Sequence, residues 1–163
     1  MEPRFPTRQC GPFKYDAYLG FGVRDLAKMN LLRRKLEQRN ILCYPKYDPA
    51  DCQQSTSTMI REGIARSKKC LLYVSRLFFN DQSFKYEVAE VQHKAKRFSR
   101  DMVVIIKHPE VDMPSELKDH CKKVICAVLD DSTLTNPEFL GSLANALLTG
   151  STCTCLCIDK HLD

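Results

Sequence analysis

The stretch Cys70-Leu71-Leu72-Tyr73-Val74-Ser75 decides the fold class of this chain. It is bounded by polar residues, is too short for a helix and shows almost no polar alternation, which is typical of a parallel strand covered on both faces. Four further short apolar segments predict strands before and after it in the sequence. They are residues 15–21, 41–44, 102–106 and 124–129.

Amphipathic helices are predicted between these strands, because apolar residues recur there every three to four positions. The clearest pattern lies in residues 81–98, where Phe84, Val88, Val91 and Ala95 share one face. The other predicted helices cover residues 24–38, 55–67, 115–123 (a short helix at best) and a last segment from Asn136-Pro137 to near Gly150. Alternating strands and helices require right-handed crossovers and predict a three-layer, doubly wound, five-stranded parallel sheet of order 2-1-3-4-5.

Length and composition indicate one globular domain rather than a disordered chain. The chain has 163 residues, 44% of them hydrophobic, and a formal charge of +5. A core of this size needs no disulfide or metal to fold, because roughly 70% of the unfolded surface can be buried. The basic excess lies in the first 46 residues, but no basic stripe alternates with aromatic residues, so nucleic acid is not an expected partner.

The predicted domain covers residues 13–150, between a flexible segment at 1–12 and a Cys-rich tail at 151–163. The longest apolar run has six residues (124–129), far below the ~20 that a membrane-spanning helix needs. The N-terminus lacks the apolar core of a signal peptide, so we expect a cytoplasmic protein with reduced thiols. Cys43, Cys70 and Cys126 fall in predicted buried strands and should be inert.

Candidate sites lie in the loops at the carboxyl ends of the strands, where doubly wound sheets bind ligands. Gly20-Phe21-Gly22-Val23-Arg24-Asp25 lacks the third glycine of a dinucleotide fingerprint, and Asp25 suits a helix N-cap instead. The loop 45–54 is long for such a connection and carries two prolines, which favours a contact element over a solvated connector. Glu87 lies at the flank of an apolar helix stripe, where it serves either as a reactive carboxylate or as a helix-border residue.

Metal and common catalytic sites are not expected. The sequence contains no P-loop, no G-x-S-x-G and no H-E-x-x-H motif. Cys153, Cys155, Cys157 and His161 alternate along a tail and would not form a closed tetrahedral shell.

Several motifs together resemble those of the Toll/interleukin-1 receptor (TIR) domain family, from Lys14 to about Leu148. Tyr15-Asp16-Ala17-Tyr18 is similar to the family's first strand, and residues 70–75 resemble its third strand, which ends in serine. Phe78 and Lys85-Tyr86-Glu87 match part of the motif that follows. Phe139-Leu140 stands where many members carry Phe-Trp.

The resemblance implies a flavodoxin-like TIR fold and an adaptor or regulator of Toll-like, innate immune signalling. Its partners would be other TIR-domain proteins, with self-association as one form of contact, and it would need no cofactor. The interaction loop corresponding to the family's BB loop would consist of Tyr47, Asp48, Pro49, Asp51 and Cys52. Basic residues of the first helix, Arg33, Arg34 and Arg39, would face acidic partners.

The family also contains enzymes that cleave the nicotinamide–ribose bond of NAD⁺, and this activity is the alternative. Glu87 would then be the catalytic residue, and Phe21 and Arg24 would contact the NAD⁺ substrate. Two departures favour the interaction hypothesis. Gly22-Val23 stands where the enzymes commonly carry arginine, and Ser83-Phe84 replaces Trp-Cys ahead of Glu87.

Overall fold

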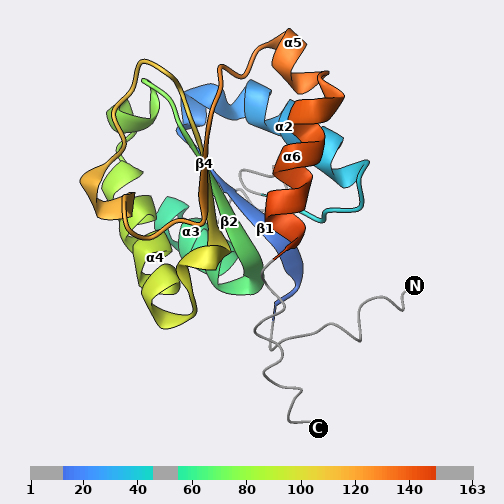
Figure 1. Cartoon of the computed structure of the whole chain (residues 1–163). Coiled ribbons are helices and arrows are strands. Elements are labelled where there is room, and N and C mark those ends of the chain that lie inside the picture. Colours follow the sequence, from blue (N-terminus) through green and yellow to red (C-terminus); the bar gives the residue numbers. More distant parts are fainter. Residues whose placement is uncertain (1–12, 46–54, 150–163) are drawn as a thin grey trace, which may run out of the picture.

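The computed structural model describes residues 13–45 and 55–149, in which helices cover both faces of a parallel sheet (Figure 1). The strands are β1 (Tyr15–Gly20), β2 (Ser67–Val74), β3 (Val103–Lys107) and β4 (Lys123–Cys126). The α-helices are α2 (Leu26–Glu37), α3 (Thr56–Arg66), α4 (Phe84–Arg97), α5 (Asp131–Leu134) and α6 (Pro137–Leu148). Short 3₁₀ turns are η1 (Val23–Asp25), η3 (Phe78–Asn80), η4 (Arg100–Met102) and η5 (Ser115–Leu117).

Within the described residues, the sheet has four parallel strands in the order β1-β2-β3-β4. The predicted α/β class and strand order are confirmed, but the five-strand prediction is wrong. The predicted second strand is reduced to one bridge, Ala17 with Cys43, on the far side of β1. The Asp16 carboxylate accepts the Leu42 N–H at 2.8 Å, so a side chain occupies a donor that a longer ladder would use.

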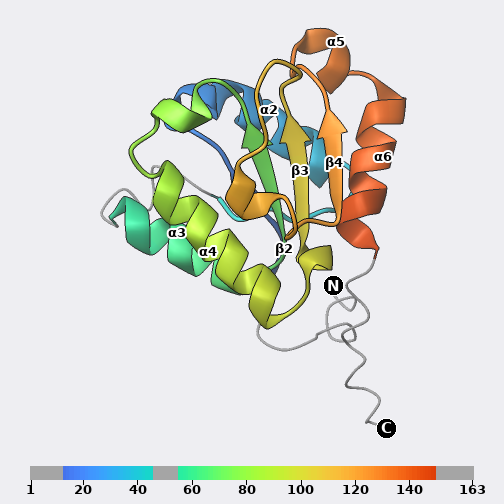
Figure 2. The same cartoon turned by 60° about the vertical axis from the view of Figure 1, so that its left-hand side comes forward.

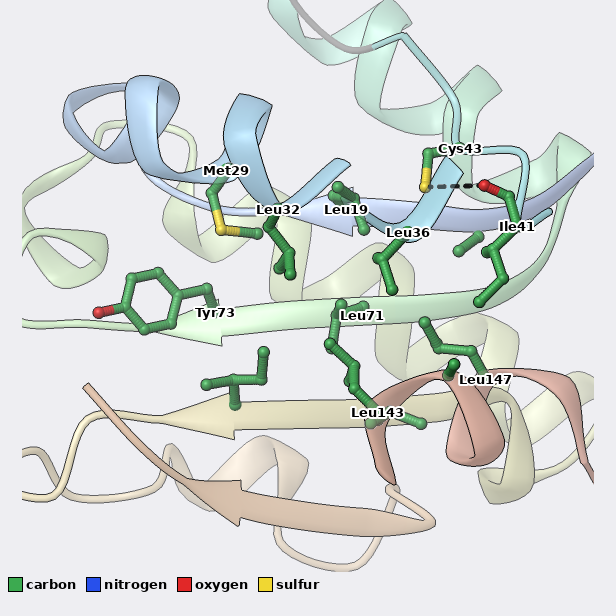
Figure 3. Close-up of a cluster of buried hydrophobic side chains, with 14 of the residues drawn as sticks. Leu19, Met29, Leu32, Leu36, Ile41, Cys43, Leu71, Tyr73, Leu143 and Leu147 are labelled. Atoms are coloured by element: carbon green, nitrogen blue, oxygen red, sulfur yellow. Dashed lines mark hydrogen bonds between the residues drawn. The ribbon is translucent and has the colours of Figure 1, made fainter. Parts of the chain in front are cut away.

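Two apolar clusters fill the spaces between the sheet and its helices. Alternate strand residues point to opposite faces, so Leu19, Leu71 and Tyr73 pack under α2 and α6, while Tyr18 and Leu72 pack under α3 and α4. Figure 2 shows the two helical layers from the side, and Figure 3 shows the first cluster at side-chain level. Both clusters are fully internal, which explains the nearly continuous apolar sequence of β2 and β3.

The chain after β3 differs from the prediction. The helix expected over 115–123 is only the turn η5, because Lys122 N–H already donates to the Val103 carbonyl at 2.6 Å and begins the pairing of β4. β4 is short and largely exposed. Cys126 is therefore exposed, and its predicted burial is wrong, whereas Cys43 and Cys70 are buried as expected.

Lysine side chains neutralise helix C-termini at the amino edge of the sheet. Lys94 is buried and donates to the Ile64 carbonyl of α3 at 2.9 Å. Lys69 is completely buried, and its Nζ donates to the carbonyls of Asp101 and Thr149 at 2.8 and 2.5 Å. A cation beside the last carbonyls of a helix also offsets the negative end of its dipole. Burial lowers the pKa of Lys94.

The buried thiols lead to a prediction about alkylation. Burial raises the pKa of Cys43 and of Cys70 to about 12, so neither forms the reactive thiolate near neutral pH. At about pH 8 we expect iodoacetamide to modify Cys126 at least ~100-fold faster than either buried thiol. Peptide mapping by mass spectrometry measures each rate, and equal rates in the folded chain would contradict the burial of Cys43 and Cys70.

The same thiols make stability depend on alkaline pH. Their pKa in the folded state lies above the ordinary value of 9.0, so their contribution is intact below about pH 9 and declines as the pH rises toward 12. The lowered pKa of Lys94 has the opposite effect, because the contribution of this lysine to stability increases as the pH rises. We therefore expect a Cys43→Ala, Cys70→Ala variant to lose less free energy of unfolding than the wild type between about pH 8 and about pH 10.5 in urea titrations.

Candidate functional site

Two aspartates tie together the loops that follow β1 and β2. Asp81 accepts the Val23 N–H at 2.8 Å through one carboxylate oxygen, and the N–H and hydroxyl of Ser83 through the other, at 2.9 and 2.5 Å. Asp25 is buried and accepts the Ser75 hydroxyl at 2.6 Å. The carboxyl edge of the sheet is thus held by charge-assisted hydrogen bonds between the two loops.

A cavity of about 570 Å³ opens at this edge of the sheet. Its walls come from η1, the start of α3, η3 and the start of α4, and they carry the polar side chains Arg24, Ser57, Asn80, Asp81 and Tyr86. Arg24, which the family resemblance suggested as a contact for NAD⁺, is exposed and lines this cavity. The location agrees with the rule that doubly wound sheets bind ligands beyond their carboxyl ends.

Glu87 lies in the first turn of α4 but points into the protein. It is 1% exposed and accepts a short hydrogen bond from the Tyr18 hydroxyl of β1. A Cβ at Gly20 would lie 3.2 Å from the carboxyl group of Glu87, so the end of β1 is in close contact with it. Glu87 does not belong to the residues that line the cavity.

Among the described residues, the predicted contact Phe21 does not lie on the same face of the sheet as Glu87. Phe21 is buried in the cluster under α2 and α6, whereas Glu87 bonds to Tyr18 on the other face of the sheet. Tyr47, Asp48, Pro49, Asp51 and Cys52 lie outside the described residues. Within 13–45 and 55–149, no group of three or more His, Cys, Asp or Glu side chains could hold a metal ion.

Four residues that position this edge were not predicted as such: Tyr18, Gly20, Asp25 and Asp81. Asp25 occupies the N-cap position of α2, as expected, but its side chain makes no capping hydrogen bond and accepts the Ser75 hydroxyl instead. The available signal was an aspartate within six residues after each of two predicted strands, but the partners of Asp25 and Asp81 lie 50 and 58 positions away in sequence.

Comparisons with known proteins place the fold. No protein-family profile matches the chain, and no curated protein sequence does. The TIR domain of the Toll-related receptor TRR-2 from Hydra magnipapillata matches with a TM-score of 0.60 and 17% identity, over 82% of this chain and 98% of that domain. The fold of this chain is therefore that of a TIR domain.

The part of a metazoan TIR-STING receptor from C. gigas that matches this chain has the same fold. It gives a TM-score of 0.61 at 17% identity over 85% of this chain, and its complex with 2',3'-cGAMP gives 0.61 at 19% identity over 83%. The matches cover 41% and 40% of those receptor chains, so this chain spans about two-fifths of their length. No helix within the described residues is long and apolar enough to cross a membrane.

Proposed function

We propose that this chain is a TIR-type interaction domain that acts in the cytoplasm as an adaptor or regulator of Toll-like, innate immune signalling. It works by reversible contact with other TIR domains, including copies of itself. The observation that supports this proposal is the burial of Glu87. A carboxylate that is 1% exposed and bonded to Tyr18 stabilises the junction of β1 and α4, and it is not presented to a ligand in the cavity.

The surfaces available for such contacts follow from charge and exposure. Arg34 and Arg39 are exposed at the end of α2, while Arg33 is half-buried. Exposed cations set the register and the rate of encounter with an acidic partner more than they set affinity. The loop containing Asp48 and Pro49 remains the predicted contact element on the basis of its sequence.

A double substitution tests the loop. Asp48→Ala with Pro49→Ala should reduce co-precipitation with receptor and adaptor TIR domains, and self-association in ultracentrifugation, by about tenfold or more, as expected when a contact centre is truncated. The matched control is Pro109→Ala with Asp112→Ala, which changes the same residue types in the exposed loop after β3. Equal binding by the two variants would contradict the assignment of the loop.

The second candidate function is cleavage of the nicotinamide–ribose bond of NAD⁺. The observation that favours it is the polar cavity containing Arg24, which opens beside the helix whose first turn carries Glu87. A carboxylate can stabilise an oxocarbenium-like transition state, but Glu87 would first have to leave Tyr18 and turn toward the cavity.

An assay of the full chain with NAD⁺ separates the two functions. We expect no nicotinamide release by chromatography, even at high protein concentration. Release that disappears in Glu87→Gln and persists in Glu90→Gln, a half-buried residue of the same helix, would establish the enzyme. This result would not by itself remove the interaction function, which the loop variant tests separately.

A further inference from the structure

The amino edge of the sheet carries an exposed aromatic side chain at the end of α4. Phe98 follows the last helical residue and is 50% exposed. Its ring contacts the half-buried ring of Phe13 edge-on, with centroids 5.7 Å apart. The charged group of Arg97 lies 5.2 Å from the centre of the Phe98 ring, and the buried Lys94 ammonium lies 5.1 Å from it.

Three segments that meet at this edge of the sheet carry further exposed cations, and the Lys14 ammonium lies 5.7 Å from the centre of the Tyr15 ring. Lys96 and Arg97 are exposed at the end of α4, Lys14 is exposed just before β1, and Arg66 is exposed at the end of α3. The Lys14 N–H donates to the Arg66 carbonyl at 2.8 Å, which brings these two residues together. We call Lys14, Arg66, Lys96, Arg97 and Phe98 the basic aromatic patch. Its residues belong to the ends of α3 and α4 and to the segment just before β1, and Figure 1 shows that these element ends lie at the lower edge of the protein.

Contacts with helix C-termini explain only part of the positive charge at this edge of the sheet. The buried Lys94 already occupies the Ile64 carbonyl at the end of α3, and Asp16 forms an ion pair with Lys68 at 3.8 Å. In the part of the chain that the structure describes, no acidic side chain forms an ion pair with Lys14, Arg66, Lys96 or Arg97. The ion pairs and helix caps of the described residues therefore leave these four cations exposed, at the same edge of the sheet as the half-exposed Phe98.

We propose that the basic aromatic patch binds the surface of an anionic lipid bilayer. Lys and Arg near such a surface are attracted by its negative potential, and long cationic side chains can reach phosphate groups while an aromatic ring enters the boundary between headgroups and acyl chains. The helix ends place the cations and the ring on one side of the domain. This contact is peripheral and independent of the proposed TIR–TIR function.

The orientation that results leaves the cavity accessible. The cavity and Arg24 lie at the carboxyl edge of the sheet, opposite the patch along the strand direction. A domain lying with its amino edge on a bilayer therefore presents the cavity to the solution.

A tryptophan probe tests the contact directly, because the chain contains no tryptophan. In the 163-residue chain, the fluorescence of Phe98→Trp should shift to the blue with phosphatidylcholine vesicles containing about 30% phosphatidylserine, and brominated acyl chains should quench it. Val128→Trp, at a 40% exposed position beyond β4, is the control and should show neither. Absence of both signals in Phe98→Trp would overturn insertion of the ring.

Charge substitutions test the electrostatic part. Lys96→Gln with Arg97→Gln should weaken binding to the same vesicles in co-sedimentation about 10- to 30-fold. Added salt should weaken the binding of the wild-type chain. The control variant, Lys28→Gln with Lys85→Gln, removes two exposed cations from the N-terminal ends of α2 and α4, at the other edge of the sheet from the patch. Equal losses in both variants, equal binding to vesicles without phosphatidylserine, or binding to poly-glutamate but not to vesicles would each overturn the proposal.

Discussion

Gly63→Ala should lower the melting temperature by about 5–15 °C, although alanine normally stabilises a helix relative to glycine by up to ~1 kcal/mol. Gly63 lies within α3, where a Cβ would lie 2.6 and 2.7 Å from two ring carbons of Tyr18 and 2.7 Å from Tyr44. Both tyrosines are buried, and the Tyr18 hydroxyl is held by Glu87. Because the rings have little room to move, we expect a net loss of about 2–4 kcal/mol.

Gly141→Ala is the matched control for this substitution. Gly141 lies within α6, and the nearest atom to its added Cβ would be a guanidinium nitrogen of Arg39 at 3.8 Å, an ordinary contact. This variant should gain about 0.5–1 kcal/mol from the better helix propensity of alanine. Urea titrations of both variants measure the two free energies. If Gly63→Ala were also stabilised, α3 would have to lie farther from the sheet than described.

Lys69→Met should destabilise the chain by about 1–3 kcal/mol, because it removes the charged donor of the Asp101 carbonyl and one of the two lysine donors of the Thr149 carbonyl, which Lys122 also reaches at 3.0 Å. The Lys69 ammonium joins the Asp101 carbonyl to the Thr149 carbonyl, and the latter directly follows α6. Methionine keeps a similar length and removes the cost of burying a charge. The loss is therefore smaller than the sum of the deleted hydrogen bonds, but the C-terminal end of α6 loses a positive charge that opposes its dipole.

Lys68→Met provides the comparison, since Lys68 is the preceding residue of β2. Its ammonium forms an ion pair with Asp16 at 3.8 Å, and the two side chains are 22% and 17% exposed. Partly exposed pairs contribute about 0–1 kcal/mol, so we expect a change of less than ~1 kcal/mol. Thermal and urea unfolding of both variants decide the matter. A loss in Lys68→Met as large as that in Lys69→Met would mean that general charge, rather than the two carbonyl contacts, produces the effect.

The sequence predicts the layers of the fold better than the ends of its elements. The apolar runs of β2 and β3 and the stripe of α4 are strong local patterns, and the structure confirms them. The predicted second strand has only four residues, and its pairing depends on whether Asp16, on another strand, competes for the Leu42 N–H. The predicted helix over 115–123 fails for a similar reason, since Lys122 pairs with Val103 of a neighbouring strand.

The candidate site could be predicted only in part. The order of strands and helices indicated the carboxyl edge, where the cavity opens, and Arg24, which the family resemblance suggested, is one of the residues that line it. A helical wheel places Glu87 at the flank of an apolar stripe, but its depth depends on Tyr18, 69 positions earlier, and on the missing side chain of Gly20. Contacts at such separations arise from tertiary packing and leave no periodic pattern in the sequence. The expected contact loop remains a prediction.

The two edges of the sheet have unequal capacity for adding strands. At the β1 edge, residues 13–45 and 55–149 offer a single bridged residue, Cys43, and the neighbouring Leu42 N–H is already bonded to a carboxylate. In the described residues, the β4 edge is longer and exposed, with Lys123 at its start. Strand addition between two copies could therefore join one β4 edge to another and would then stop, because such a pair has no further long edge to offer. A polymer of this domain would have to grow through its loops and helices.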